Sequence, residues 1–249
     1  MAEESRAGSK FDQARILRLL ACGVVREEHG MLRFSSNYTF LVSVSDDETS
    51  TLAVYKPQRG ERPLWDFPDG TLCYREVAAF VVSDALGWRI VPPTVLRDGP
   101  RGLGSLQLYI HNNADVNYFS LDETFANQLM RFAAFDYIIN NADRKGGHCL
   151  LASDGHLWGI DHGIGFHTAP KLRTVIWDFA GKSIPDAILI DIQRVYTEID
   201  DLNCRTRLEL DKLLAEAEIQ AVLARMRRIL QRREYPRPGP GPNYPWPPV

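Results

Sequence analysis

Apolar residues alternate with polar ones in short runs over the first part of the chain, and this pattern predicts strands. Residues 38–44 and 51–55 are rich in aromatic and β-branched side chains and are separated by a polar turn, which is typical of an antiparallel pair. Residues 30–34 are expected to form a preceding strand, joined through a tight turn at residues 35–37. Further along, 105–110 is expected to be a strand, and 90–96 an edge strand because prolines occupy its entry.

Elsewhere apolar residues recur three and four positions apart, which predicts amphipathic helices. These helices are expected at residues 11–22, 71–86, 124–139 and over most of 184–230. Arg225, Arg227 and Arg228 are expected to lie on the solvated face of the last of them. Residues 168–173 form a polar, basic loop between the two helical regions.

Between these regions, residues 140–166 combine apolar runs with isolated acids. CLLA and LWGI are separated by Ser153-Asp154-Gly155, which predicts a β-hairpin. Asp143 precedes this hairpin and Asp161 follows it directly, so both carboxylates are expected at one edge of the small sheet. Paired acids that converge from two loops suit binding of a divalent metal and activation of a hydroxyl group.

Composition limits the class of protein. The chain has 249 residues, 45% of them hydrophobic, with a net charge of -3 and a pI near 6.1, which argues against broad nucleic-acid binding. Four cysteines are scattered without a CxxC pair, so a reduced cytoplasmic setting is expected. No secretory signal is visible, and no apolar run approaches the ~20 residues of a transmembrane helix, which leaves peripheral contact as the mode of any membrane association.

These patterns predict an α+β protein in two parts. Residues 11–112 would form a β-rich lobe that carries the helix at 71–86, and residues 113–234 would form a mainly helical lobe. Residues 1–10 are expected to be disordered. The Pro-rich residues 235–249 are expected to be extended, as a flexible end, as a docked strap, or as a ligand for a protein partner with Tyr244 and Trp246 as anchors.

Two further charged residues precede the acidic pair. Lys56 ends an apolar strand, and Glu76 lies near the start of the helix at 71–86. Taken singly, Lys56 could be a solvated edge residue and Glu76 a carboxylate that favours the helix dipole. Together with Asp143 and Asp161, they match what phosphoryl transfer from ATP requires, since a lysine neutralises phosphates, a helix acid orients the lysine, and loop acids hold metal and hydroxyl.

With these residues the chain resembles the atypical kinases of the phosphatidylinositol 3-/4-kinase superfamily. It looks closest to a small bacterial branch common in actinobacteria and is more loosely similar to HipA-type kinases. That family has a catalytic loop D-R-H-x-x-N and a metal motif D-F-G, and the corresponding segments here are residues 143–148 and 161–163. His148 falls five positions after Asp143, and Asp161 falls thirteen after His148, which is the family register. The resemblance implies a two-lobed, protein-kinase-like fold.

The resemblance also implies roles for individual residues. ATP would be contacted by Lys56, which pairs with Glu76, and by Ile160 beneath the adenine. The phosphate loop would be Ser35, Ser36 and Asn37, and the hinge would be Gln107, Leu108, Tyr109 and Ile110. Catalysis would fall to Asp143, the acid/base, with Arg144 in the same loop.

For the metal, the resemblance implies Mg²⁺ or Mn²⁺ held by Asp161, with His148 and Asn141 as further candidate ligands. Lys171 and Arg173 follow the metal motif, where they would bind an anionic substrate or form only a solvated basic loop. The acceptor would be a hydroxyl on a lipid, a small polyol or a protein.

Three departures from the family pattern leave alternatives open. His148 stands where the family has Asn, Lys145 replaces the loop His, and His162 replaces the Phe of the metal motif. An imidazole suits Mn²⁺ better than Mg²⁺. The first alternative is therefore a pseudokinase, a nucleotide-binding or scaffolding module without phosphotransfer. The second is a zinc hydrolase, whose ligands would be His148, Asp161, His162 and His167.

Overall fold

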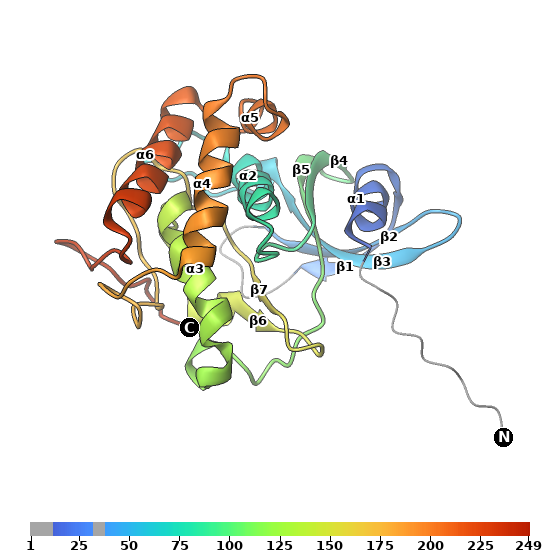
Figure 1. Cartoon of the computed structure of the whole chain (residues 1–249). Coiled ribbons are helices and arrows are strands. Elements are labelled where there is room, and N and C mark those ends of the chain that lie inside the picture. Colours follow the sequence, from blue (N-terminus) through green and yellow to red (C-terminus); the bar gives the residue numbers. More distant parts are fainter. Residues whose placement is uncertain (1–11, 32–37) are drawn as a thin grey trace.

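The computed structural model describes residues 12–31 and 38–249, and five strands within them form one antiparallel sheet. In spatial order they are β1 (Val24–Met31), β2 (Phe40–Ser45), β3 (Ser50–Pro57), β5 (Gly102–Leu108) and β4 (Thr94–Gly99). β2 and β3 pair without irregularity, and β5 enters between β3 and β4. In Figure 1 this sheet lies on one side of the molecule and most helices lie on the other.

The helix α1 (Gln13–Cys22) packs on the sheet through Leu19 and Leu20, which are fully buried. Its first turn is capped by Asp12, whose carboxylate accepts a hydrogen bond from the backbone N–H of Arg15. The helix ends before Gly23, whose extended backbone leaves the helix and where a Cβ would lie 2.5 Å from the carbonyl oxygen of Leu19, so only glycine fits. The helix therefore covers one face of the N-terminal sheet.

Five helices form the rest of the framework. They are α2 (Leu72–Leu86), α3 (Ala126–Ile139), α4 (Asp186–Asp200), α5 (Arg205–Leu210) and α6 (Glu216–Arg232). Short 3-10 turns lie at Gln58–Gly60, Tyr118–Ser120, Glu123–Phe125 and Gly146–His148. α2 is buried over most of its circumference and contacts β4 and β5 on one side and α4 and α5 on the other. Figure 1 shows it between the sheet and the other helices, so it couples the two parts.

The core consists of two hydrophobic clusters. The smaller joins α1 to the sheet, and the larger is built from α2, α3, α4 and α6. A second, two-stranded sheet of β6 (Cys149–Leu151) and β7 (Leu157–Gly159) lies between them. Trp158 of β7 is buried in the smaller cluster, whereas Leu157 belongs to the larger one. The β6–β7 hairpin is therefore fixed by both parts of the molecule.

The α+β class, with an antiparallel N-terminal sheet and helices mostly C-terminal, is confirmed, as is the hairpin at β6–β7. The exact limits of the two lobes stay a prediction. The strand expected at 30–34 begins earlier, at Val24, and β1 is described as far as Met31, while residues 32–34 lie outside the described residues. Its start was missed because β1 is largely exposed and lacks the alternation that marks a half-buried strand. The strand expected at 90–96 begins only at Thr94, because the prolines before it have no backbone N–H to donate.

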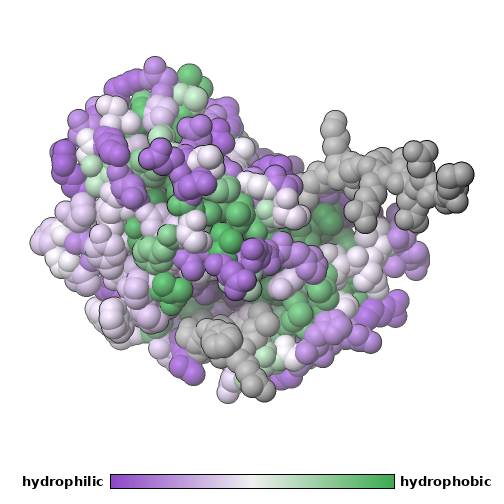
Figure 2. Space-filling model, turned by 90° about the horizontal axis from the view of Figure 1, so that it is seen from below, coloured by the Kyte–Doolittle hydropathy of each residue, from purple (hydrophilic) through white to green (hydrophobic). Residues whose placement is uncertain are grey.

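The surface is mixed in polarity. In Figure 2, which views the molecule from below, hydrophobic patches lie in the middle of the face between hydrophilic areas. Among the helices formed by residues 12–31 and 38–249, none is both long and apolar enough to cross a membrane.

Candidate functional site

Lys56 connects the sheet to the helical part. It lies next to the end of β3, paired with Ser105 of β5, and its side chain is 18% exposed. Its ammonium forms an ion pair with Glu76 of α2 and lies 2.6 Å from Oδ1 of Asp161. Burial disfavours the charged form, but the negative charges of Asp161 and Glu76 outweigh it and raise the pKa of Lys56. The reading of Lys56 as a solvated edge residue does not fit this arrangement.

Glu76 is fixed from two sides. Its side chain is buried, one carboxylate oxygen accepts from Lys56, and the other accepts from the backbone N–H of His162 at 3.0 Å. α2 is oriented by Glu61, whose carboxylate accepts the backbone N–H groups of Leu72 and Cys73. Glu61 thus stabilises the start of the helix that carries Glu76.

Asp143 follows the end of α3. The helix ends at Asn140, which adopts the left-handed conformation with φ 54° and bonds through its side chain to the carbonyl groups of His167 and Ala169. The pKa of Asp143 is raised to about 6, chiefly by burial and also by the nearby charge of Asp161, while Lys145, 3.6 Å away, opposes the shift. A carboxylate with this pKa can accept a proton near neutral pH.

Asp161 lies two residues after the end of β7, whereas Asp143 precedes the β6–β7 hairpin. Its φ of 64° is unusual for a residue with a side chain and indicates local strain held by the surroundings. The charge of Lys56 is the main cause that holds the pKa of Asp161 well below its usual range. The expected convergence of the two loop acids with Lys56 and Glu76 is seen in one cleft, which is also lined by Glu61 and Cys73.

His148 faces Asp161 with its Nε2 atom 3.4 Å from Oδ2. Burial lowers the pKa of His148 to about 4, so the ring is neutral at neutral pH. Its Nδ1 lies 3.4 Å from the backbone N–H of Lys145, in a position to accept from it. In that tautomer Nε2 carries the proton and faces Asp161, so His148 must change tautomer to bind a metal through Nε2.

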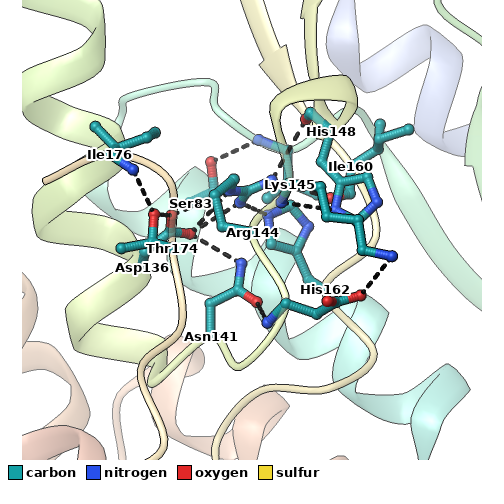
Figure 3. Close-up of polar contacts among 12 residues, drawn as sticks. Ser83, Asp136, Asn141, Arg144, Lys145, His148, Ile160, His162, Thr174 and Ile176 are labelled. Atoms are coloured by element: carbon teal, nitrogen blue, oxygen red, sulfur yellow. Dashed lines mark hydrogen bonds and ion pairs between the residues drawn. The ribbon is translucent and has the colours of Figure 1, made fainter. Parts of the chain in front are cut away.

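Arg144 was expected in a catalytic role, but the structure places it inside the protein. Its side chain is completely buried and bonds to both carboxylate oxygens of Asp136 at 3.0 and 3.2 Å. It also donates to the carbonyl oxygen of Ile160 and contacts His162 Nε2 (Figure 3). Arg144 therefore positions the catalytic loop against the residues on either side of Asp161, and it does not face the cleft.

Asn141, expected as a candidate metal ligand, also points inward. It is fully buried, its Nδ2 donates to Asp136, and its Oδ1 accepts the backbone N–H of Asp143 (Figure 3). Thr174 completes the same network through Asp136. This geometry does not support a metal-binding role for Asn141 and gives it the task of holding Asp143 in place.

Other expected residues are placed less decisively. Ser35, Ser36 and Asn37 lie outside the described residues. Gln107 is buried and donates to Thr94, Leu108 and Ile110 belong to the core of the sheet, and Tyr109 packs its ring on His111. Ile160 is partly exposed and donates its backbone N–H to the carbonyl of His148. Their roles at an adenine stay predictions.

Lys171 is already paired. It forms an ion pair with Asp66, and its ammonium lies 5.0 Å from the ring centre of Trp65. Arg173 carries no ion pair within the described part of the chain, but its backbone joins Asn141 and Arg144. Of the two expected substrate cations, Arg173 is therefore the one whose charge is unmatched.

The donor set fits a metal that arrives with a nucleotide. Within residues 12–31 and 38–249, no group of three or more His, Cys, Asp or Glu side chains is arranged to hold an ion by itself. Mg²⁺ is often held by only one or two carboxylates together with substrate phosphates, and Asp161, with Asp143 in the same cleft, offers that. The zinc alternative fares worse, because His162 is buried against Arg144 and His167 packs on Phe67.

Comparisons with known proteins identify sequences and structures that are similar to this chain. Residues 97–206 match the family described as phosphatidylinositol 3- and 4-kinase. The chain is 41% identical over 253 residues to Protein Rv2133c of Mycobacterium tuberculosis, covering 88% of this chain and 90% of that protein. It is also 32% identical over 108 residues to phosphatidylinositol 4-kinase gamma 4 of rice, Oryza sativa subsp. japonica, a match that covers 36% of this chain and 19% of the rice protein.

Among solved structures, the chain is similar to a Helicobacter pylori proinflammatory kinase, CtkA. The TM-score is 0.51 with 13% sequence identity, and the match covers 87% of this chain and 94% of that one. At this identity the likeness concerns the fold alone. It agrees with a kinase-like arrangement of an N-terminal sheet and a helical C-terminal part.

Proposed function

The chain belongs to the phosphatidylinositol 3- and 4-kinase superfamily, and we propose that it transfers the γ-phosphate of ATP to a hydroxyl group of an acceptor. The observation that carries the proposal is the contact of one ammonium with two acids from distant parts of the chain. Lys56 bonds to Glu76, 20 positions away, and to Asp161, 105 positions away. A partly buried lysine held by a helix acid beside a loop acid is the arrangement that phosphoryl transfer uses.

In this proposal each residue has a definite task. Lys56 binds phosphate oxygens, and Glu76 keeps it extended. Asp161, with His148 beside it, would hold the divalent cation, which neutralises charge on the phosphates when it is bound. Asp143 accepts the acceptor's hydroxyl proton while the acceptor oxygen bonds to the γ-phosphorus and the bond to the β-phosphate oxygen breaks, so that ADP leaves.

The buried hydrogen-bond network around Asp136 keeps the catalytic groups in position. Asp136 holds Arg144, Arg144 holds the backbone of Ile160, and Asn141 holds the backbone of Asp143. Phosphoryl transfer depends mainly on positioning and electrostatics, and small displacements of the two acids are costly. These residues act through the catalytic groups and not on the substrate.

Three classes of acceptor fit the proposal. The name of the rice relative refers to a phosphatidylinositol kinase, which makes an inositol hydroxyl one candidate. Small polyols and protein hydroxyls remain the other two. Acceptor panels should therefore contain all three classes, because the loops that select an acceptor vary between related kinases.

The test is formation of ADP and labelled product with Mg²⁺ and with Mn²⁺, in the wild type and in Asp161→Ala. We expect Asp161→Ala to lose turnover, whereas the control Asp154→Ala, in the exposed turn of the β6–β7 hairpin, keeps it. Unchanged turnover in Asp161→Ala would remove the metal assignment. Nucleotide binding by the wild type without transfer to any acceptor, with either metal, would instead identify a pseudokinase, the reading that the replacement of Asn by His148 favours.

A further inference from the structure

A second cavity, away from the catalytic cleft, is lined by apolar residues, by the proline-rich tail and by several cations. It encloses about 1090 Å³ between α6, residues 168–173 and residues 236–243 of the C-terminal tail. Its lining shares no residue with the cleft that contains Lys56, Asp143 and Asp161. In Figure 1 the tail passes beside the lower end of α6 and ends near α3.

Five arginines line this cavity, and they are Arg173, Arg225, Arg228, Arg232 and Arg237. The only acid in the lining is Glu234, and Lys171, which also lines the cavity, is already paired with Asp66. This concentration of positive charge stands out in a chain whose net charge is -3. A cavity lined by one sign of charge raises the local concentration of the opposite ion.

The arginines of α6 divide into two kinds. Arg227 bonds to Tyr196, and Arg233 at the C-cap forms an ion pair with Asp186. Arg228 and Arg232, in contrast, make no ion pair and no side-chain hydrogen bond with any residue in the described part of the chain. The unmatched charges are thus the ones that line the cavity.

Arg225 provides the second observation. It was expected on a solvated face, but its guanidinium is mostly buried and donates to the carbonyl oxygens of Ile138 and His167. Its remaining nitrogen, Nη2, is buried and has no partner. Burial lowers the pKa of Arg225 to about 10. A buried cation without a carboxylate and with an unsatisfied donor is a costly arrangement that a bound anion would relieve.

The spacing sets the size of the ligand. Arg225, Arg228 and Arg232 follow one helix face over seven positions, which at 1.5 Å per residue spans about 10 Å. This span exceeds the size of one phosphate group, so the three arginines suit a ligand that carries more than one. Arginine binds phosphate oxygens in pairs with good geometry, so neighbouring arginines on this face suit separate phosphate groups.

We propose that this cavity binds a compact anion with at least two phosphate groups, at a site separate from the nucleotide cleft. The shared chemistry is a cluster of phosphates, supplied either by a free small molecule or by the headgroup of a phosphorylated lipid. The anion would join α6, the loop that contains Arg173, and the tail.

The tail connects this cavity to the catalytic loop through hydrogen bonds. The carbonyl oxygen of Asn243 accepts from the backbone of Thr174 and from the indole of Trp177, both at 3.1 Å. The carbonyl of Pro248 accepts the backbone N–H of Gly146, which lies in the catalytic loop, at 2.7 Å. An anion that holds the tail therefore also holds the loop that carries Asp143.

The first arm of the test uses inorganic tripolyphosphate, measured by calorimetry at 50 mM NaCl. We expect tripolyphosphate to bind both the wild type and Lys56→Met, in which the nucleotide cleft has lost its lysine. Binding to Arg228→Ala/Arg232→Ala should be roughly tenfold weaker for each arginine removed. The control Arg205→Ala/Arg227→Ala removes the same charge outside the cavity and should bind as the wild type does. Both double variants replace exposed arginines, and equal melting temperatures without ligand would show that they are folded.

The second arm distinguishes the two sources. Phosphatidylcholine vesicles with 5% of a bisphosphorylated phosphatidylinositol are sedimented with the wild type and with Arg228→Ala/Arg232→Ala. Arginine-dependent binding to vesicles supports a lipid headgroup, and arginine-dependent binding of tripolyphosphate alone supports a free anion. The proposal is overturned if neither probe binds, if binding is lost equally in both double variants, or if only Lys56→Met loses it.

Discussion

The buried pair of Asp136 and Arg144 offers the sharpest test of how the site is held. Both side chains are completely buried, and the guanidinium contacts the carboxylate through Nε and Nη2 at 2.9 to 3.2 Å. Asp136→Ala leaves Arg144 as a buried charge without a counterion. Breaking such a pair from one side typically costs about 3–5 kcal/mol of unfolding free energy.

For a chain of this length, each kcal/mol corresponds to roughly 2–4 °C in melting temperature, so Asp136→Ala should melt about 6–20 °C below the wild type. The matched control is Glu209→Ala, which removes a carboxylate from a surface pair with Arg205, itself 90% exposed. That pair should contribute no more than about 1 kcal/mol. Urea unfolding followed by tryptophan fluorescence measures both variants under the same conditions.

A double variant separates stability from positioning. In Asp136→Leu/Arg144→Met no buried charge remains, so part of the lost stability should return. Phosphotransfer should stay low, because nothing then donates to the carbonyl of Ile160 or fixes the catalytic loop. If Asp136→Ala costs no more than Glu209→Ala, or if the double variant is fully active, then the network does not hold the site as argued.

Three further changes test separate parts of the site. Asp143→Asn should slow transfer by about 10²–10⁴. Since burial raises the pKa of Asp143 to about 6, wild-type turnover should fall as the pH drops through 6. The charged carboxylate is the form that burial destabilises, so the substitution should raise the melting temperature more at pH 8, where the wild-type group is charged, than at pH 4. His148→Asn supplies a harder oxygen ligand and should raise the ratio of Mg²⁺- to Mn²⁺-supported turnover; an unchanged ratio would mean that His148 does not set metal choice. Glu61→Ala leaves the N–H groups at the start of α2 without their acceptor and should cost about 1 kcal/mol in urea unfolding, with reduced turnover because α2 carries Glu76.

Local sequence signals were sufficient for much of the framework. α2 and α3 were expected within two residues of their observed starts, because their apolar spacing is regular. The two short runs around Ser153-Asp154-Gly155 predicted the hairpin that separates Asp143 from Asp161. The two acids were expected at one edge of this small sheet, and they line one cleft together with Lys56.

Inward-facing residues of the catalytic loop could not be identified in this way. Arg144 and Asn141 lie beside Asp143 in sequence, and their burial follows from a partner, Asp136, on the preceding helix. A fully buried acid on a helix, such as Asp136, is not detected by hydrophobic periodicity, because that periodicity identifies only apolar faces. An acid before the start of a helix is a signal for capping, so the role of Glu61 was partly detectable. Ten residues separate Glu61 from α2, however, and the sequence does not show which of the acids in this loop accepts from the helix N–H groups.

The contact between Lys56 and Asp161 has a consequence for metal binding. Their distance of 2.6 Å means that the ammonium neutralises the carboxylate that would hold the cation. A metal alone must displace Lys56 from Asp161, whereas nucleotide phosphates would draw Lys56 away and free the acid. Nucleotide and metal should therefore bind cooperatively, with a coupling of about 1–3 kcal/mol.

Lys56→Met isolates this effect. Without the competing ammonium, Mn²⁺ alone should bind about tenfold more tightly than it binds the wild type, in line with the lower end of such coupling energies, while nucleotide affinity falls. Calorimetric titration of Mn²⁺ without nucleotide measures the change, and Lys145→Met, which removes a cation beside Asp143, is the matched control. If Mn²⁺ affinity does not rise in Lys56→Met beyond that control, then Lys56 does not hold Asp161 against the metal, and the two ligands must be coupled through direct contact between phosphate and cation alone.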